Sequence, residues 1–140
     1  MLLPKSVKYR KMHKNTTKSH QVATTKTRLA FGVYGLKAMT DGWVTARQIE
    51  AARRAMMHYL KRGGKIWIRI FPDKPVTTKG AEVPMGGGKG AVDHYVAVVR
   101  PGTILFEVDG IDRVSAAEAM RLAKHKLPLR SRFITKEQTV

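Results

Sequence analysis

The chain has 140 residues, of which 43% are hydrophobic, and its 27 Lys/Arg against 10 Asp/Glu give a formal net charge of +17. This length supports one hydrophobic core, so we expect a single domain over residues 1–140. The absence of cysteine excludes disulfides, cysteine-based zinc sites and thiol catalysis. No apolar run approaches the roughly 18 residues of a membrane span, so no membrane partner is expected.

The positive charge is concentrated towards the N-terminus. Residues 1–40 contain nine Lys/Arg and no acid, residues 41–90 contain ten against four, and residues 91–140 contain eight against six. Residues 1–27 also lack hydrophobic periodicity, which predicts a basic extended arm on a globular body over residues 28–136. Such a charge gradient is typical of a protein that binds a polyanion, above all a nucleic acid.

An acid-free, Thr-rich N-terminus also suits an organelle presequence. Pro4 and the β-branched residues between Thr16 and Thr27 disfavour the amphipathic helix that such a presequence forms. We therefore expect a cytoplasmic protein, with an organellar location as the alternative.

The first elements of the body are a strand over Leu29–Tyr34, a connection over Gly35–Gly42, and a helix that begins at Thr45. Thr45 and Gln48 have the spacing of a capping box. Gly63-Gly64 predicts that the helix ends at about Arg62. A buried face with helical periodicity is formed by Ile49, Ala52, Met56 and Tyr59.

The opposite side of this helix carries a cationic stripe. Arg47, Arg54 and Lys61 are spaced by seven residues, and Arg53 lies beside them. A solvated charged face is the usual explanation of such a pattern. Here Glu50 is the only acid on the helix, so we infer that intrahelical pairing cannot neutralise the stripe and that it contacts phosphate.

Residues 65–71 alternate as a strand, with the isoleucines on the core side. Trp67 faces the other way, where it either packs or stacks on a base. A long loop over residues 76–91 follows and ends in Met85-Gly86-Gly87-Gly88-Lys89-Gly90.

The glycine-rich segment does not match a nucleotide-binding P-loop. That motif needs a glycine where the chain has Val83, and a Ser or Thr where it has Gly90. A dinucleotide fingerprint also fails, because no helix is expected after it. The segment is either a connector or a flexible loop whose backbone can approach a sugar–phosphate chain closely.

In the C-terminal half, strands over His94–Arg100 and Thr103–Val108 are predicted to form a hairpin at Pro101-Gly102. Ser115 and Glu118 predict a second capping box, with a helix that continues to Leu127 and ends before Pro128. A last strand covers Leu129–Thr135, and the final residues are expected to fray. This order predicts an α+β fold with two helices and a mostly antiparallel sheet.

The residues give no argument for catalysis or for a cofactor. The five histidines lack metal-ligand spacing, and the ten acids are not paired on a shared face. A small RNA-processing enzyme that uses Asp93, His94 and Lys89 is a hypothesis without a nucleophile signature. We therefore expect no catalytic residue, no metal and no cofactor.

Five colinear blocks resemble bacterial-type large-subunit ribosomal protein sixteen, a member of the universal large ribosomal subunit protein sixteen family. The resemblance runs from about residue 1 to residue 136. The blocks are Pro4-Lys5 with Lys8-Tyr9-Arg10-Lys11, Ala46–Ala55, Lys65–Arg69, Phe71–Pro75, and Met85-Gly86 with Gly88-Lys89-Gly90.

The resemblance implies an α/β-hammerhead-like fold and a structural, non-enzymatic constituent of the large ribosomal subunit. It also implies binding to 23S-type rRNA, contact with the A-site tRNA, and a role in late subunit assembly and translation. The P-site tRNA is a second candidate contact, and neighbouring ribosomal proteins are expected partners. By analogy, the loop Met85–Gly90 reaches towards the peptidyl-transferase region. The family usually has Arg and Lys where this chain has Pro84 and Gly87, so the loop tip is less cationic here.

The residues predicted to bind rRNA are cations of the arm, the first helix and the following strands, with one arm tyrosine. They are Lys5, Lys8, Tyr9, Arg10, Lys11, Lys14, Arg47, Arg53, Arg54, Lys61, Lys65, Arg69 and Lys74. RNA is favoured over DNA, and no DNA partner is expected, because no helix-turn-helix, finger or zipper is evident. A nucleoid-type protein that binds any nucleic acid is the main rival hypothesis.

Overall fold

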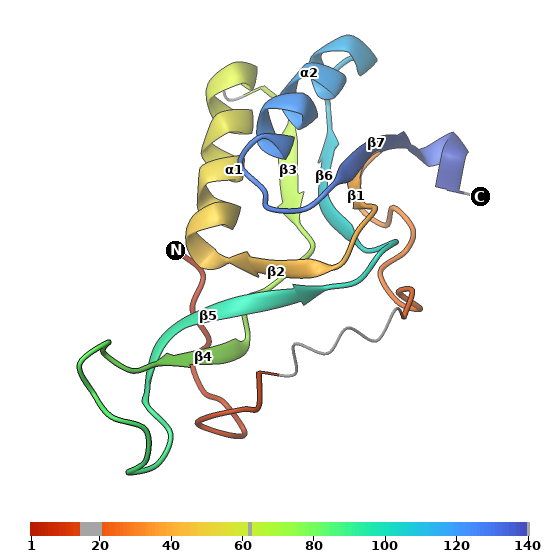
Figure 1. Ribbon diagram of the computed structural model, residues 1–140. Helices are drawn as coiled ribbons and strands as arrows, with labels where there is room; N and C mark the ends of the chain where they lie inside the picture. The colour runs from red at the N-terminus through yellow and green to blue at the C-terminus, as the bar shows by residue number, and fades with distance from the viewer. Residues whose placement is uncertain (15–20, 62, 140) are drawn as a thin grey trace.

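The computed structural model describes residues 1–14, 21–61 and 63–139 (Figure 1). The elements in chain order are β1 (Tyr34–Ala38), β2 (Gly42–Thr45), α1 (Ala46–Leu60), β3 (Lys65–Ile68), β4 (Lys74–Thr78), β5 (Ala91–Val99), β6 (Ile104–Asp109), α2 (Arg113–Lys124), β7 (Ser131–Thr135) and a short 3-10 helix, η1 (Lys136–Thr139).

The strands form two sheets in which every pairing is antiparallel. The larger sheet has the order β3-β6-β1-β7, and the smaller sheet has the order β2-β5-β4. Helices α1 and α2 lie side by side next to the larger sheet, and the smaller sheet lies at the other end of the molecule (Figure 1). The prediction of an α+β fold with two helices is confirmed.

The core lies between the two helices and the sheets. Small residues on α2, such as Ala116 and Ala119, let the helices approach closely and are fully buried. On α1, Ile49, Ala52 and Met56 are buried as predicted, whereas Tyr59 is 39% exposed. The predicted face of α1 is therefore the packed face over its first three turns.

The boundaries of α1 follow from its sequence. The capping box is present: Gln48 N donates to Thr45 Oγ1 at 3.2 Å, and Thr45 N donates to Gln48 Oε1 at 2.9 Å. The helix ends at Leu60, slightly earlier than predicted, because Lys61 takes a left-handed conformation with φ 50°. The predicted last residue, Arg62, lies outside the described residues.

The predicted strand over 29–34 is wrong, because the strand runs over Tyr34–Ala38. Residues 29–32 instead lie against the larger sheet as a non-strand segment. At Gly32 a Cβ would lie 2.6 Å from the carbonyl oxygen of Val108, so only glycine allows this approach. At Gly35 a Cβ would lie 2.4 Å from Leu29 Cδ2, so the missing side chain makes room for Leu29.

The predicted hairpin between the strands after residue 93 is also wrong. The turn exists, with Thr103 N donating to the Arg100 carbonyl at 3.2 Å and Gly102 at φ 100°. However, β5 belongs to the smaller sheet and β6 to the larger one. The turn therefore carries the chain from one sheet to the other.

Other element boundaries also differ from the prediction. Residues 76–78 belong to β4 and Ala91 to β5, so the loop between them covers only residues 79–90. Helix α2 is capped by Asp112, which accepts from Ser115 N at 3.3 Å, and it ends at Lys124. The predicted strand over 65–71 is shortened to β3, and the last strand begins at Ser131.

Candidate nucleic-acid interface

Four lysines meet where the arm crosses the base of the loop. Lys11 Nζ donates to the carbonyl of Lys89 at 3.0 Å, and Lys89 Nζ donates in return to the carbonyl of Met12. Lys74 Nζ, on β4, donates to the carbonyl of Lys14 at 2.7 Å. We call Lys11, Lys14, Lys74 and Lys89 the arm–loop junction. It joins segments that are sixty or more residues apart in the sequence.

The arm–loop junction concentrates positive charge without a carboxylate partner. Burial, and then the nearby charge of Lys89, lowers the pKa of Lys74. Lys74 Nζ also lies 4.7 Å from the centre of the Trp43 ring, a cation–π contact. Within the part of the chain that the structure describes, none of the ion pairs involves these four lysines. An anion bound here would relieve the repulsion between them.

A hollow of about 460 Å³ opens at this junction and has the lining that a phosphate group needs. It is lined by Lys14 and Lys89, with Thr77 and Thr78 of β4. Ammonium and hydroxyl groups are both donors to phosphate oxygens. Lys79 also lines it and was not predicted, because nothing distinguishes it in the sequence from other loop lysines.

The loop 79–90 extends away from the body (Figure 1). Lys79 Nζ donates to the carbonyl of Gly86 at 2.7 Å and so braces the tip. The Met85 side chain is fully exposed, and Gly86, Gly87 and Gly88 have φ of 108°, 75° and 89°. A Cβ at any of the three glycines would meet nothing within 4 Å. Their role is therefore conformational, since these φ values favour glycine.

The cationic stripe on α1 is partly paired. Glu50 accepts from Arg53 through Nε at 3.0 Å and Nη2 at 2.5 Å, and from Arg54 through Nε at 3.1 Å. The hydrogen bond from Arg53, aided by the charges of both arginines, lowers the pKa of Glu50 to about 2. Glu50 carries one negative charge against the four cations of the stripe, so pairing reduces the positive charge of the stripe without neutralising it. The side chain of Arg54 remains 75% exposed.

The two predicted cations on and just after β3, Lys65 and Arg69, differ in their surroundings. Arg69 Nη1 donates to Glu107 Oε2 at 2.6 Å, and only 14% of the Arg69 side chain is exposed. The Arg69 guanidinium is therefore paired with Glu107 within the globular body. Lys65 is exposed and lies 5.3 Å from the centre of the Trp67 ring.

The arm residues predicted to contact RNA lie on the surface. Lys5, Lys8, Tyr9 and Arg10 are all exposed, and Lys8 Nζ lies 5.5 Å from the centre of the Tyr9 ring. Residues 1–14 and 21–27 contain no helix or strand. The arm nevertheless touches the body: Ala23 N donates to the Pro101 carbonyl, and the Lys26 carbonyl accepts from Ile104 N.

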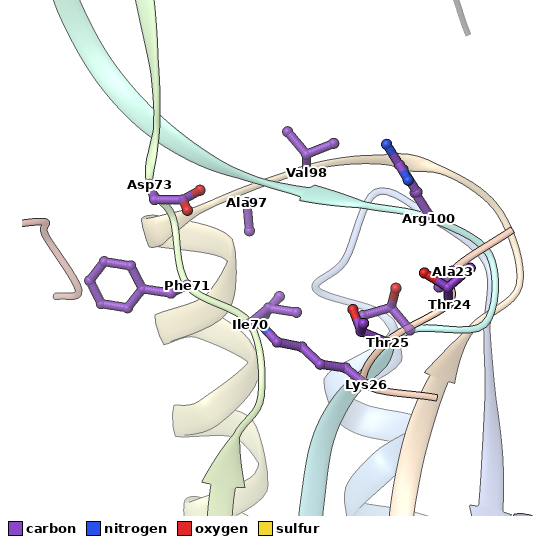
Figure 2. Close-up of a pocket in the computed structure, with 11 residues that line it drawn as sticks. Ala23, Thr24, Thr25, Lys26, Ile70, Phe71, Asp73, Ala97, Val98 and Arg100 are labelled. Carbon is purple, nitrogen blue, oxygen red and sulfur yellow. The ribbon is translucent and has the colours of Figure 1, made fainter. Parts of the chain in front are cut away.

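A second hollow of about 350 Å³ lies where residues 23–26 meet β5 (Figure 2). Ile70 and Ala97 supply apolar lining, and Lys26 and Asp73 supply charged groups, whereas the Val98 and Arg100 side chains point to the other side of β5 (Figure 2). Sequence reasoning missed this place, because the arm residues that close it show no periodicity.

Other kinds of site find little support among the described residues. No group of three or more His, Asp or Glu is arranged to hold a metal ion there. No helix within the described ranges is both long and apolar enough to cross a bilayer. Asp93 Oδ2 and His94 Nδ1 are 2.7 Å apart, but this pair is solvent-exposed.

The family described as ribosomal protein L16p/L10e matches residues 4–134. The match covers nearly the whole chain, so the chain belongs to this family. It is therefore a structural protein of the large ribosomal subunit, located in the ribosome, and not an enzyme.

Proposed function

We propose that this protein anchors 23S-type rRNA through its arm, the arm–loop junction and helix α1. The observation that carries the proposal is the arm–loop junction, where lysines from three segments meet without a carboxylate partner among the described residues. Lysines in this setting bind phosphates by displacing condensed counterions. The fixed positions of arm and loop add a shape that only a folded RNA matches.

The proposed contacts divide by exposure. The exposed cations of the arm and α1, with Lys65, contact phosphates directly, and Tyr9 stacks beside them. The lysines of the arm–loop junction bind phosphate and also hold the arm on the loop. Arg69 positions the body instead, because its guanidinium is bonded to Glu107.

We also propose that the loop tip, Met85–Gly90, lies beside the A-site tRNA, with the P-site tRNA as the second contact. The support is its projection from the body and its nearly side-chain-free backbone. Docking of the arm and loop on already folded rRNA suits a protein that joins the subunit late and contacts neighbouring ribosomal proteins. Pro84→Arg, which restores the usual family residue without replacing a glycine of positive φ, is expected to tighten A-site tRNA binding to ribosomes that carry the variant.

The test of rRNA anchoring is the salt dependence of binding between the full chain and large-subunit rRNA. Replacing Lys5, Lys8 and Arg10 by Gln should weaken binding and lower the slope of log K against log salt by about two units. The matched control replaces Arg113, Lys124 and Lys126, which are also exposed but lie on or beside α2, away from the arm (Figure 1). Equal slopes for both triple variants would refute the anchoring role of the arm.

A competition binding experiment distinguishes recognition of RNA shape from binding by charge alone. At 0.15 M salt, the complex with labelled large-subunit rRNA should survive an excess of unrelated RNA and of duplex DNA. Complete displacement by either competitor would favour a protein that binds any nucleic acid.

A further inference from the structure

An aromatic pair lies on the larger sheet beside Lys65, and the proposed rRNA contacts do not yet give it a role. The Phe31 and Trp67 rings are nearly parallel, with an interplanar angle of 17° and centroids 5.9 Å apart. This offset arrangement leaves part of each ring uncovered. Arg69 Cζ lies 5.3 Å from the centre of Phe31, and Lys65 Nζ lies 5.3 Å from the centre of Trp67.

The backbone that carries Phe31 is held by a buried carboxylate. Glu107 is completely buried, and its Oε1 accepts from the backbone N–H groups of Ala30, Phe31 and Gly32 at 2.8, 3.1 and 3.2 Å. Three successive N–H groups on one oxygen form a nest that fixes the local conformation. Arg69 bonds the other carboxylate oxygen, so segment and strand are tied together.

The Phe31 ring is exposed even though Glu107 fixes the backbone that carries it. Phe31 is 58% exposed although its backbone is anchored. Exposing a large aromatic ring is unfavourable in the free protein, and fixing its position brings no gain in burial. A ring that is already fixed binds a flat partner with a more favourable free energy, because it loses little side-chain entropy when the partner stacks on it.

The surrounding charge identifies the partner. Arg28, Lys65 and Arg69 lie along the two segments that bear the rings. Two acids of β6 lie opposite β3: Glu107, which is bonded to Arg69, and Asp109, which is the register partner of Lys65. The three cations therefore still outnumber the two acids. A flat ring attached to an anionic backbone is a nucleotide. We propose that the Phe31–Trp67 pair is a stacking site for an unpaired base of the bound rRNA, whose flanking phosphates contact Arg28 and Lys65.

The inference rests on rRNA binding, so its test separates the two. Affinity for large-subunit rRNA is measured as a function of salt for the full chain and for Phe31→Ala, Phe31→Trp and Phe71→Ala. Phe71 is the matched control, because it is also an exposed phenylalanine, at 43%, but is not part of the pair. Thermal unfolding of each variant shows that it is folded.

Stacking predicts that Phe31→Ala weakens binding roughly ten-fold or more. The salt slope should stay unchanged because no cation is removed. Phe31→Trp should bind like the unmodified protein, and Phe71→Ala should lie within about two-fold of it. Chemical probing should show one unpaired nucleotide whose base becomes more reactive with Phe31→Ala.

Binding of Phe31→Ala within about two-fold of the unmodified protein would overturn the stacking site while leaving rRNA binding intact. So would equal losses for Phe31→Ala and Phe71→Ala, which would mean a general apolar effect. Failure of the unmodified protein in the competition experiment would instead refute the proposed function itself.

Discussion

Removing the Glu107 carboxylate is expected to be the most destabilising single change in the body. Glu107 is fully buried in β6 and satisfies four donors at once: three backbone N–H groups of residues 30–32 and the guanidinium of Arg69. Glu107→Ala leaves these donors without their acceptor and leaves Arg69, which is 14% exposed, without its counter-charge. An unpaired charge of this kind costs far more than the pair contributes.

The expected loss for Glu107→Ala is about 3–5 kcal/mol in the free energy of unfolding. A typical domain has only about 5–15 kcal/mol in total, so the variant should be close to unfolding at 37 °C. Glu107→Gln keeps one oxygen for the backbone donors but turns an amide N–H₂ towards Arg69. It should lose about 1–3 kcal/mol, the value of a hydrogen bond to a charged group.

Urea unfolding at fixed salt, followed by circular dichroism, measures these differences. A double-mutant cycle with Arg69→Ala tests the pair more directly. The sum of the two single losses in unfolding free energy should exceed the loss of the double variant by more than about 1 kcal/mol. A Glu107→Ala loss below about 1 kcal/mol, or additive single losses, would show that the carboxylate does not hold residues 30–32 on the sheet.

Three further changes test local features of the fold. Gly32→Ala places a Cβ 2.6 Å from the Val108 carbonyl oxygen and should cost about 1–3 kcal/mol in urea unfolding, whereas the exposed Ala30→Gly should cost less than about 1 kcal/mol. Thr45→Ala removes the cap of α1 and should cost about 1 kcal/mol, measured as a lower unfolding temperature, and an unchanged temperature would argue against the capping box. The lowered pKa of Glu50 means that its arginine pairs stabilise the folded state above pH 4.5 and lose this effect as the pH falls towards about 2. Glu50→Gln should therefore be less stable than the unmodified protein at pH 6, by at most about 1 kcal/mol because solvent screens the pairs, and the two should converge near pH 2.

Local sequence signals predicted the helices well but not the partners of the strands. The capping box of Thr45 fixes the start of α1 because it acts within a few residues, whereas the helix ends at the left-handed Lys61, slightly before the predicted Gly63-Gly64 stop. The assignment of β5 and β6 to separate sheets depends on contacts between distant segments. A Pro-Gly turn signal is local and carries no information about those contacts. Helix α2 is capped by Asp112, three residues before the predicted Ser115, because the Asp112 side chain accepts from Ser115 N.

The strand predicted at Leu29–Tyr34 shows what a local pattern leaves out. Its alternation of residues suits a strand, yet two glycines and a carboxylate 75 residues away hold it in another conformation. One signal was present: Glu107 is the only charged residue in the apolar run Ile104–Val108. A buried acid in such a run requires donors, and the sequence does not say which ones.

The candidate interface was predictable in residue type but not in geometry. Charge composition indicated the arm, α1 and the loop, and all three carry the exposed cations. The bonds from lysine ammonium groups to carbonyls at the arm–loop junction depend on the path of the backbone. No pattern of side chains encodes that path.

The paired arginines and the lysines of the arm–loop junction have separate roles in this molecule. The arginines that are paired lie on α1, α2 and at the end of β3, where Glu50, Glu118 and Glu107 hold them against the body. The lysines of the arm–loop junction have no such partner within the described chain and are free to exchange counterions for phosphates. Salt should therefore weaken rRNA binding steeply while barely changing the buried Arg69–Glu107 pair, since screening acts on exposed charges far more than on buried ones. A protein released from rRNA by high salt should consequently remain folded and bind again when the salt is removed.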